Sequence, residues 1–114
     1  MKSFDLAGLA RSQGGEYVLG KKDLHSDACY LVYGCLDPDG STRPIKPGKG
    51  YEEIFCAIDG PLVMHTDRGE IVLERGHAVH VREDESFAIT NRSDQPVVYV
   101  LAGAPAARSE KIAG

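Results

Sequence analysis

The side chains that could do chemistry are few and widely spaced along this chain of 114 residues. Histidine and cysteine side chains can exchange protons, and the imidazole nitrogen and the thiolate sulfur bind transition metals. Four histidines and three cysteines are present, and their spacings match no zinc or redox motif. The histidines are His25, His65, His77 and His80, and the cysteines are Cys29, Cys35 and Cys56. We expect mostly surface histidines and cysteines that act as small core hydrophobes, although a metal site combining Glu53, a histidine and a cysteine stays open.

The elements that must position these side chains are short strands. Turn signals rich in Gly, Pro and Asp recur at short intervals, and the runs between them are too short for helices. The stretch Asp67-Arg68-Gly69 between two apolar runs predicts a hairpin, with Gly69 free to adopt positive φ. Only residues 4–10 look helical. Strands are predicted near residues 16–19, 28–36, 53–58, 62–66, 70–73, 78–81, 86–91 and 97–102, which indicates an all-β sandwich or barrel.

Composition limits the classes of function. The chain has the length of one domain, and 42% of its residues are hydrophobic. Its net charge is −4 and its basic residues are scattered, so we expect no nucleic-acid partner. No run approaches the roughly 20 apolar residues of a membrane span, so we expect no membrane partner. Unpaired cysteines and no recognisable export signal predict a cytoplasmic protein.

Two stretches resemble the paired motifs of the cupin superfamily. Residues 46–60, KPGKGYEEIFCAIDG, are similar to the first motif, G-x5-H-x-H-x(3,4)-E-x6-G. Residues 76–91, GHAVHVREDESFAITN, are similar to the second, G-x5-P-x-G-x2-H-x3-N. The resemblance is to small single-domain, cupin_2-like conserved barrel proteins and implies a double-stranded β-helix of the jelly-roll type. We predict one barrel over residues 1–103, with an N-terminal arm and short helix at 1–14, and a flexible tail at 104–114.

The resemblance breaks at the metal ligands. In metal-binding cupins the ligands are two histidines and the glutamate of the first motif and the histidine of the second. Here Glu53 holds the glutamate position, but Phe87 stands at the second-motif histidine. The first-motif histidines fall on Lys46 and Gly48, or on Pro47 and Lys49 if the loop is one residue shorter. An ammonium and a phenyl ring are not ligands. We therefore expect a degenerate metal site, no metal and no other cofactor.

The resemblance still implies a pocket, and five residues are its expected lining. If Lys46 points inward, its ammonium pairs with the Glu53 carboxylate, because a buried carboxylate needs a partner. Phe87 either plugs the core or forms a stacking platform. Tyr51 and Glu52 flank the mouth, and Arg43 precedes it. The expected ligand-binding set is Lys46, Glu53, Phe87, Tyr51 and Arg43, for an unidentified small polar molecule.

Three functions remain open. The first is a metal-independent small-molecule-binding protein, which we favour. The second is an isomerase, epimerase or lyase that uses Lys46, Glu53 or a histidine for acid–base chemistry, and the third is a plugged barrel that acts as an interaction module. We also expect a homodimer, because outward apolar residues at Ile54, Cys56 and Ile58 would leave a patch that a monomer should not expose.

Overall fold

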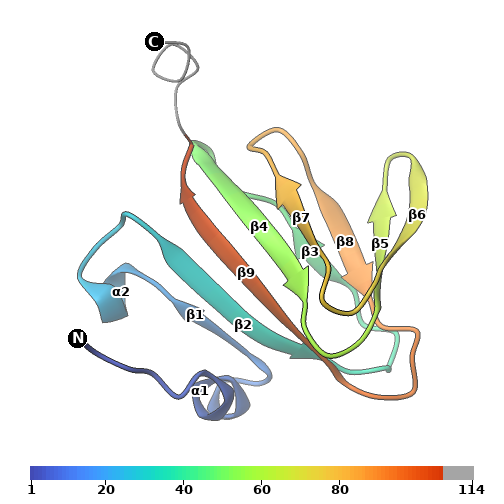
Figure 1. The fold of residues 1–114 in the computed structure, drawn as a ribbon, viewed down its shortest axis with the longest axis horizontal. Helices are drawn as coiled ribbons and strands as arrows, with labels where there is room; N and C mark the ends of the chain where they lie inside the picture. The colour runs from blue at the N-terminus through green and yellow to red at the C-terminus, as the bar shows by residue number, and fades with distance from the viewer. Residues whose placement is uncertain (107–114) are drawn as a thin grey trace.

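The computed structural model describes residues 1–106, which form two antiparallel β-sheets packed face to face (Figure 1). The five-stranded sheet has the order β1-β2-β9-β4-β7, and the four-stranded sheet has the order β3-β8-β5-β6. The strands are β1 (Glu16–Leu19), β2 (Tyr30–Leu36), β3 (Arg43–Ile45), β4 (Tyr51–Ala57), β5 (Leu62–Thr66), β6 (Gly69–Leu73), β7 (Ala78–Val81), β8 (Phe87–Thr90) and β9 (Val97–Pro105). The predicted all-β jelly roll with a short N-terminal helix is confirmed.

The core lies between the sheets and follows from the period of two in the long strands. Along β4, Glu53, Phe55 and Ala57 are buried while Ile54 between them is exposed. Strand β9 alternates in the same way from Val97 to Ala104. Aromatic stacking helps to fill the core, since the rings of Phe55 and Tyr99 lie 5.4 Å apart. The largest fully buried side chains are Phe55, Ile45, Leu62, Ile89, Val81 and Val97.

Two tyrosines cross a neighbouring strand by passing over a glycine. In the first row, Tyr30 on β2 and Glu53 on β4 are both paired with Gly103 on β9. The ring of Tyr30 covers Gly103, where an added Cβ would lie 2.1 Å from Tyr30 Cζ. The tyrosine hydroxyl therefore reaches past β9 and donates a hydrogen bond to Glu53 Oε2.

The second row repeats this arrangement with the roles of β2 and β9 exchanged. Tyr99 on β9 lies over Gly34 on β2, and its hydroxyl donates to Glu16 on β1. In both rows the missing Cβ makes room for the ring, and the ring covers the backbone that the glycine leaves bare. The rows tie β1, β2, β9 and β4 into one unit through side chains as well as backbone.

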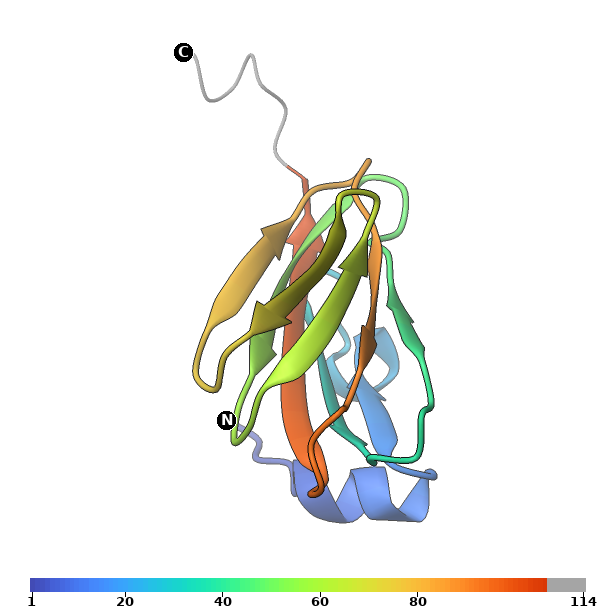
Figure 2. The same ribbon diagram turned by 90° about the vertical axis from the view of Figure 1, so that its right-hand side faces the viewer.

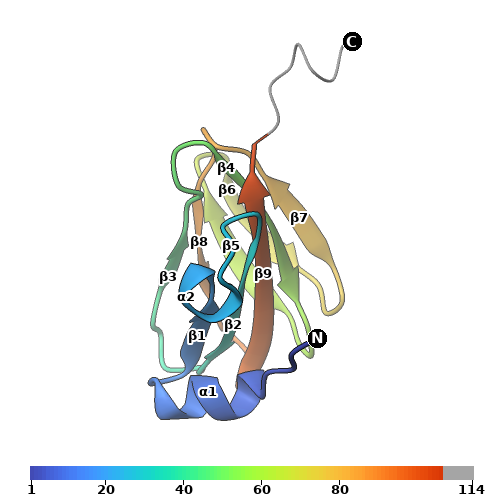
Figure 3. The ribbon, with the colours of Figure 1, turned by 90° about the vertical axis from the view of Figure 1, so that its left-hand side faces the viewer.

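Two helices lie outside the sheets, next to β1 (Figure 3). Helix α1 (Leu6–Ser12) begins at Asp5, whose side chain accepts a hydrogen bond from Gly8 N, as an N-cap residue does. Helix α1 packs against β1 and β2. It starts and ends two residues later than predicted. Helix α2 (Lys21–Leu24) was not predicted, because four residues are too few to show a helical period.

Two strand predictions also needed correction. Strand β3 was missed because it has three residues and contains Pro44, which is compatible only with an edge strand. Strand β9 continues to Pro105, so the predicted tail boundary at 103/104 falls inside a strand. The rest of the predicted tail, from 107 to 114, lies outside the described residues. Within residues 1–106, no helix is long and apolar enough to span a membrane.

The two sides of the sandwich differ. On one side the edge strands β1 and β3 are joined by Arg43, whose guanidinium binds both carboxylate oxygens of Glu16 at 2.8 and 3.1 Å. On the other side the edge strands are β7 and β6, and this side faces the viewer in Figure 2. No ion pair of the described residues joins β7 to β6. We call the side with β1 and β3, where the Arg43–Glu16 ion pair links the two sheets, the pinned side. The side with β6 and β7 is the unpinned side.

Candidate functional site

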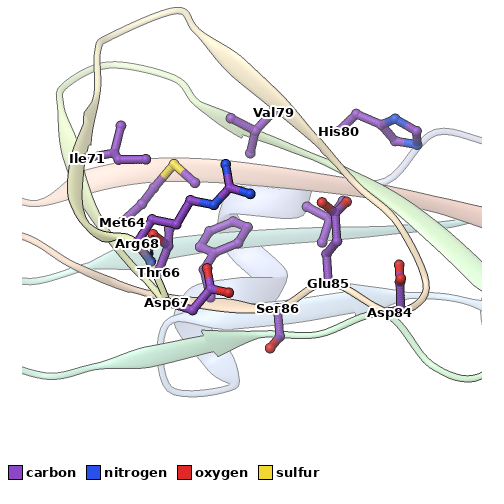
Figure 4. A pocket seen from close by; sticks show the side chains of 12 residues that line it. Met64, Thr66, Asp67, Arg68, Ile71, Val79, His80, Asp84, Glu85 and Ser86 are labelled. Carbon is purple, nitrogen blue, oxygen red and sulfur yellow. Dashed lines mark hydrogen bonds between the residues drawn. The ribbon is translucent and has the colours of Figure 1, made fainter.

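A pocket of about 530 Å³ lies on the unpinned side, between the β5–β6 hairpin and β7 with the loop that follows it (Figure 4). Its volume is within the range of about 300–1,000 Å³ that is usual for small-molecule sites. The lining residues are Met64, Thr66, Asp67, Arg68, Ile71, Val79, His80, Val81, Asp84, Glu85, Ser86 and Phe87.

The floor of the pocket is apolar. Met64 on β5 and Val81 on β7 are core residues that also reach the pocket. The ring of Phe87 packs edge-on against Phe55, with centroids 5.8 Å apart and an interplanar angle of 87°. Phe87 is partly buried, so one part of the ring closes the core while another part lines the pocket. Phe87 therefore contributes both to the core and to the pocket lining, and its role as a stacking platform stays a prediction.

The hairpin side of the rim carries one cation. Gly69 has φ +106° and turns the chain, as the hairpin prediction required. The hydroxyl of Thr66 closes the turn, accepting from Arg68 N at 3.1 Å and donating to Gly69 O at 2.9 Å. This local network fixes the backbone that carries Arg68. Among residues 1–106, no carboxylate lies within 4.0 Å of the Arg68 guanidinium.

The loop side of the rim carries carboxyl groups. Glu85 Oε1 accepts a hydrogen bond from Arg82 N at 2.9 Å, which anchors this side chain across its own turn. Its carboxylate and that of Asp84 are drawn on the opposite side of the pocket from the base of the Arg68 side chain (Figure 4). Asp67 adds a third carboxyl group. The rim therefore has three carboxyl groups and one guanidinium above an apolar floor. Asp84 and Glu85 lie on the loop wall, whereas Asp67 precedes Arg68 on the hairpin wall.

Glu53 lies inside the sandwich, next to the pocket and not in its lining. Its side chain is 7% exposed, and its strand partner is Val81 of the pocket floor. Tyr30 supplies its one hydrogen bond, and Oε1 is buried without a partner. Burial together with the Glu53 carboxylate raises the pKa of Tyr30, so this hydroxyl remains a donor throughout the physiological range.

The predicted ion pair between Lys46 and Glu53 is not formed. Lys46 follows β3 and is exposed, and no ion pair joins it to Glu53. Tyr30, 23 residues before Glu53 in sequence, is the partner instead. The buried Glu53 carboxylate does have a hydrogen-bond partner, as expected. The spacing of the two motifs could not identify that partner as Tyr30, because Tyr30 lies outside both motifs.

The other predicted lining residues are divided between two places. Arg43 forms an ion pair with Glu16 on the pinned side and does not line the pocket. Tyr51 packs edge-on against Tyr30, with centroids 5.8 Å apart, and lies beside the Glu53 row. Of the five predicted residues, Phe87 alone lines the pocket. Arg68 was not among the predicted site residues, although the predicted hairpin already placed it at an exposed tip.

The residues at the expected metal position do not fit a metal. Phe87 and exposed Lys46 offer no ligand atom to join Glu53. His80 pairs with Glu52 at 2.6 Å on the outer face of the large sheet, and His65 contacts Thr90 Oγ1 at 2.7 Å. Within the described part of the chain, no three His, Cys, Asp or Glu side chains converge as metal ligands would.

No protein-family model matches the chain, and no curated protein matches it either. Solved structures do. A cupin protein from Bacteroides fragilis is 19% identical with a TM-score of 0.70, covering 94% of this chain and 83% of that one. The Cupin_2 domain of an XRE family transcriptional regulator from Enterobacter cloacae is 21% identical with a TM-score of 0.63, covering 82% and 99%.

A third similar structure is an enzyme. A sugar phosphate isomerase of the cupin superfamily from Silicibacter pomeroyi is 19% identical with a TM-score of 0.63, covering 93% of this chain and 68% of that one. A regulatory domain and an enzyme are thus equally similar in backbone to this chain. The likeness establishes the fold, and the fold by itself does not select a function.

Proposed function

From the premise that this chain has the cupin fold, we propose that it is a metal-independent protein that binds a small molecule in the pocket between the β5–β6 hairpin and β7. The observation that carries the proposal is the pocket itself. It combines an apolar floor with polar and charged groups on its rim, which is the usual composition of a small-molecule site.

The side chains at the expected metal position support binding without a metal. Transition metals require imidazole, thiolate or carboxylate ligands. The expected position offers a phenyl ring, an exposed ammonium and one carboxylate that already accepts from Tyr30. The interactions available to a ligand are therefore burial against Met64 and Phe87 and hydrogen bonds or ion pairs at the rim.

The two alternative functions have less support. An acid–base enzyme needs a titratable pair within hydrogen-bond reach in a cavity. The Tyr30–Glu53 pair is inside the sandwich, and neither residue lines this pocket. In the His80–Glu52 pair only His80 belongs to the lining, and its hydrogen bond to Glu52 lies on the outer face of the large sheet. A plugged interaction module needs no pocket, whereas here Phe87 leaves part of its ring facing one.

The two methionines allow a direct test, because one lies on the pocket floor and the other at the exposed N-terminus. With 13C-methyl-methionine labelling, 1-hexanol added to EDTA-treated protein should shift the Met64 resonance saturably and leave Met1 unchanged. Val79→Phe fills the pocket and should weaken the response at least tenfold. Ala78→Phe, on the opposite face of the same strand, is the matched control and should not.

The proposal fails if Met64 shows no saturable shift. It also fails if Val79→Phe and Ala78→Phe behave alike, because the probe would then bind elsewhere. A response that appears only after a transition metal is added would contradict metal independence.

We further propose that the protein is a homodimer formed through the outer face of the large sheet. Ile54 is 52% exposed and Ile58 is 42% exposed, and both lie on or next to β4. Exposed Ala102 pairs with Ile54 on the same face. Light scattering after size exclusion should return twice the chain mass of 12.3 kDa. Ile54→Asp should return the monomer, and a monomeric parent protein would refute the proposal.

A further inference from the structure

The charges around the pocket say more about the ligand than its volume does. Resting on the function proposed above, we infer that the pocket selects an amphoteric molecule whose carboxylate and ammonium groups are separated by an apolar segment. Arg68 receives the carboxylate, the loop carboxylates of Glu85 and Asp84 receive the ammonium, and the apolar segment lies on the floor between them.

Opposite charges line the same pocket and form no ion pair with each other. Arg68 comes from the β5–β6 hairpin and Glu85 from the loop after β7, and both reach toward the space between (Figure 4). No ion pair joins them, since no carboxylate of the described residues lies within 4.0 Å of Arg68. A guanidinium and a carboxylate that face a shared cavity unpaired are each available to a ligand.

Each charged wall can offer a directed contact. Thr66 fixes the hairpin backbone beneath Arg68 through two hydrogen bonds. Glu85 is anchored through Oε1 to Arg82 N, which leaves Oε2 for a ligand. The backbone that carries Arg68 and the side chain of Glu85 are thus held before a ligand binds, which lowers the conformational entropy lost on binding.

The net charge of a ligand decides how well it matches the two charged walls. A simple anion meets one guanidinium but also three carboxyl groups, from Asp67, Asp84 and Glu85. A simple cation pairs with the loop carboxylates and covers Arg68 without giving it a partner. An amphoteric molecule satisfies both walls, and discrimination against the other two arises from the unpaired or repelled charge that each leaves behind.

The apolar segment of the ligand lies on the pocket floor between the two charged walls. Met64, Val79, Val81, Phe87 and Ile71 supply the apolar part of the pocket lining. A methylene chain that crosses this surface removes it from water, and each buried methylene strengthens binding about fourfold. A short polar zwitterion such as glycine gains nothing from this surface.

Four probes with the same number of carbon atoms, six, separate these contributions, each followed by the Met64 methyl resonance. They are 6-aminohexanoate, hexanoate, hexylamine and 1-hexanol. We expect 6-aminohexanoate to bind roughly tenfold more tightly than hexanoate or hexylamine, the effect of one further charge-assisted hydrogen bond. Glycine should cause no saturable shift.

Charge-removing variants assign each end of the probe. Arg68→Gln should remove the advantage of 6-aminohexanoate over hexylamine and leave its advantage over hexanoate. Glu85→Gln keeps an oxygen acceptor for Arg82 N and should do the reverse. If either variant leaves both advantages unchanged, the wall it modifies does not bind the ligand and the inference is wrong.

The outcomes separate this inference from the function on which it rests. If 1-hexanol binds and 6-aminohexanoate binds no more tightly than both singly charged probes, the pocket binds ligands but does not select amphoteric ones. Tightest binding of hexanoate or of hexylamine overturns the inference in the same way. If none of the four probes shifts Met64, the proposed binding function itself fails.

Discussion

Gly103→Ala provides the most demanding test of the structure, because one methyl group should break a contact between two distant strands. An ideal Cβ at this position would lie 2.1 Å from Tyr30 Cζ and 2.4 Å from Tyr30 Oη. Both distances are far inside van der Waals contact, so the ring must leave its place over β9. The hydrogen bond from Tyr30 to Glu53 is lost with it, and Oε2 joins Oε1 as a buried oxygen without a partner.

The loss of stability in Gly103→Ala follows from the buried carboxylate that it leaves without a hydrogen-bond partner. A buried group that loses its hydrogen-bond partner costs about 1–3 kcal/mol, and a charged group costs more. The displaced ring also loses packing against Tyr51. We expect Gly103→Ala to lower the free energy of unfolding by about 3 kcal/mol. Urea unfolding followed by far-UV circular dichroism measures it, since the chain has no tryptophan for fluorescence.

The same substitution in the Tyr30→Val variant shows whether the ring of Tyr30 causes this loss of stability. In Tyr30→Val the ring is absent, and alanine at 103 should then be neutral or stabilising by about 0.5–1 kcal/mol, because Gly103 is not at positive φ and glycine weakens a strand. Gly48→Ala is the control, since the nearest atom to its Cβ is Tyr51 Cδ2 at an ordinary 3.7 Å. Equal costs of Gly103→Ala in both backgrounds would refute the Tyr30–Gly103–Glu53 arrangement.

Three further predictions concern other parts of the molecule. Burial acts to raise the pKa of Glu16, but hydrogen bonds from Arg43 and Tyr99 lower it overall. Its contribution to stability is therefore present above the ordinary pKa of 4.5 and is lost as the pH falls below it, so Glu16→Gln should flatten acid unfolding. Asn91 Nδ2 donates to Leu36 O and Gln95 O, so Asn91→Asp should cost about 3 kcal/mol in urea unfolding, and no loss would contradict these bonds. Elemental analysis of untagged protein should find no stoichiometric transition metal, and a stoichiometric one would overturn the degenerate metal site.

Local pattern determined the fold class. The turn residues, the short runs between them and the hairpin at Asp67-Arg68-Gly69 each depend on a few neighbouring residues, and all were predicted. The jelly-roll topology was predicted from the resemblance of residues 46–60 and 76–91 to the two cupin motifs, and not from local pattern alone. Helix α2 and strand β3 were missed, since each is too short to repeat any period.

The site could not be predicted in the same way. A period of two tells which face of a strand a residue occupies, but not which residue of a distant strand lies beside it. Tyr30 reaches Glu53 because β2 and β4 both pair with β9 in a register that puts Gly103 between them. Likewise, Arg68 and Glu85 share a pocket because β6 and β7 are the edges of two different sheets. The sequence by itself determined what could be buried and where the chain turns, since those preferences are local. The tertiary structure decided which charges meet, because that depends on the register and packing of strands far apart in the chain.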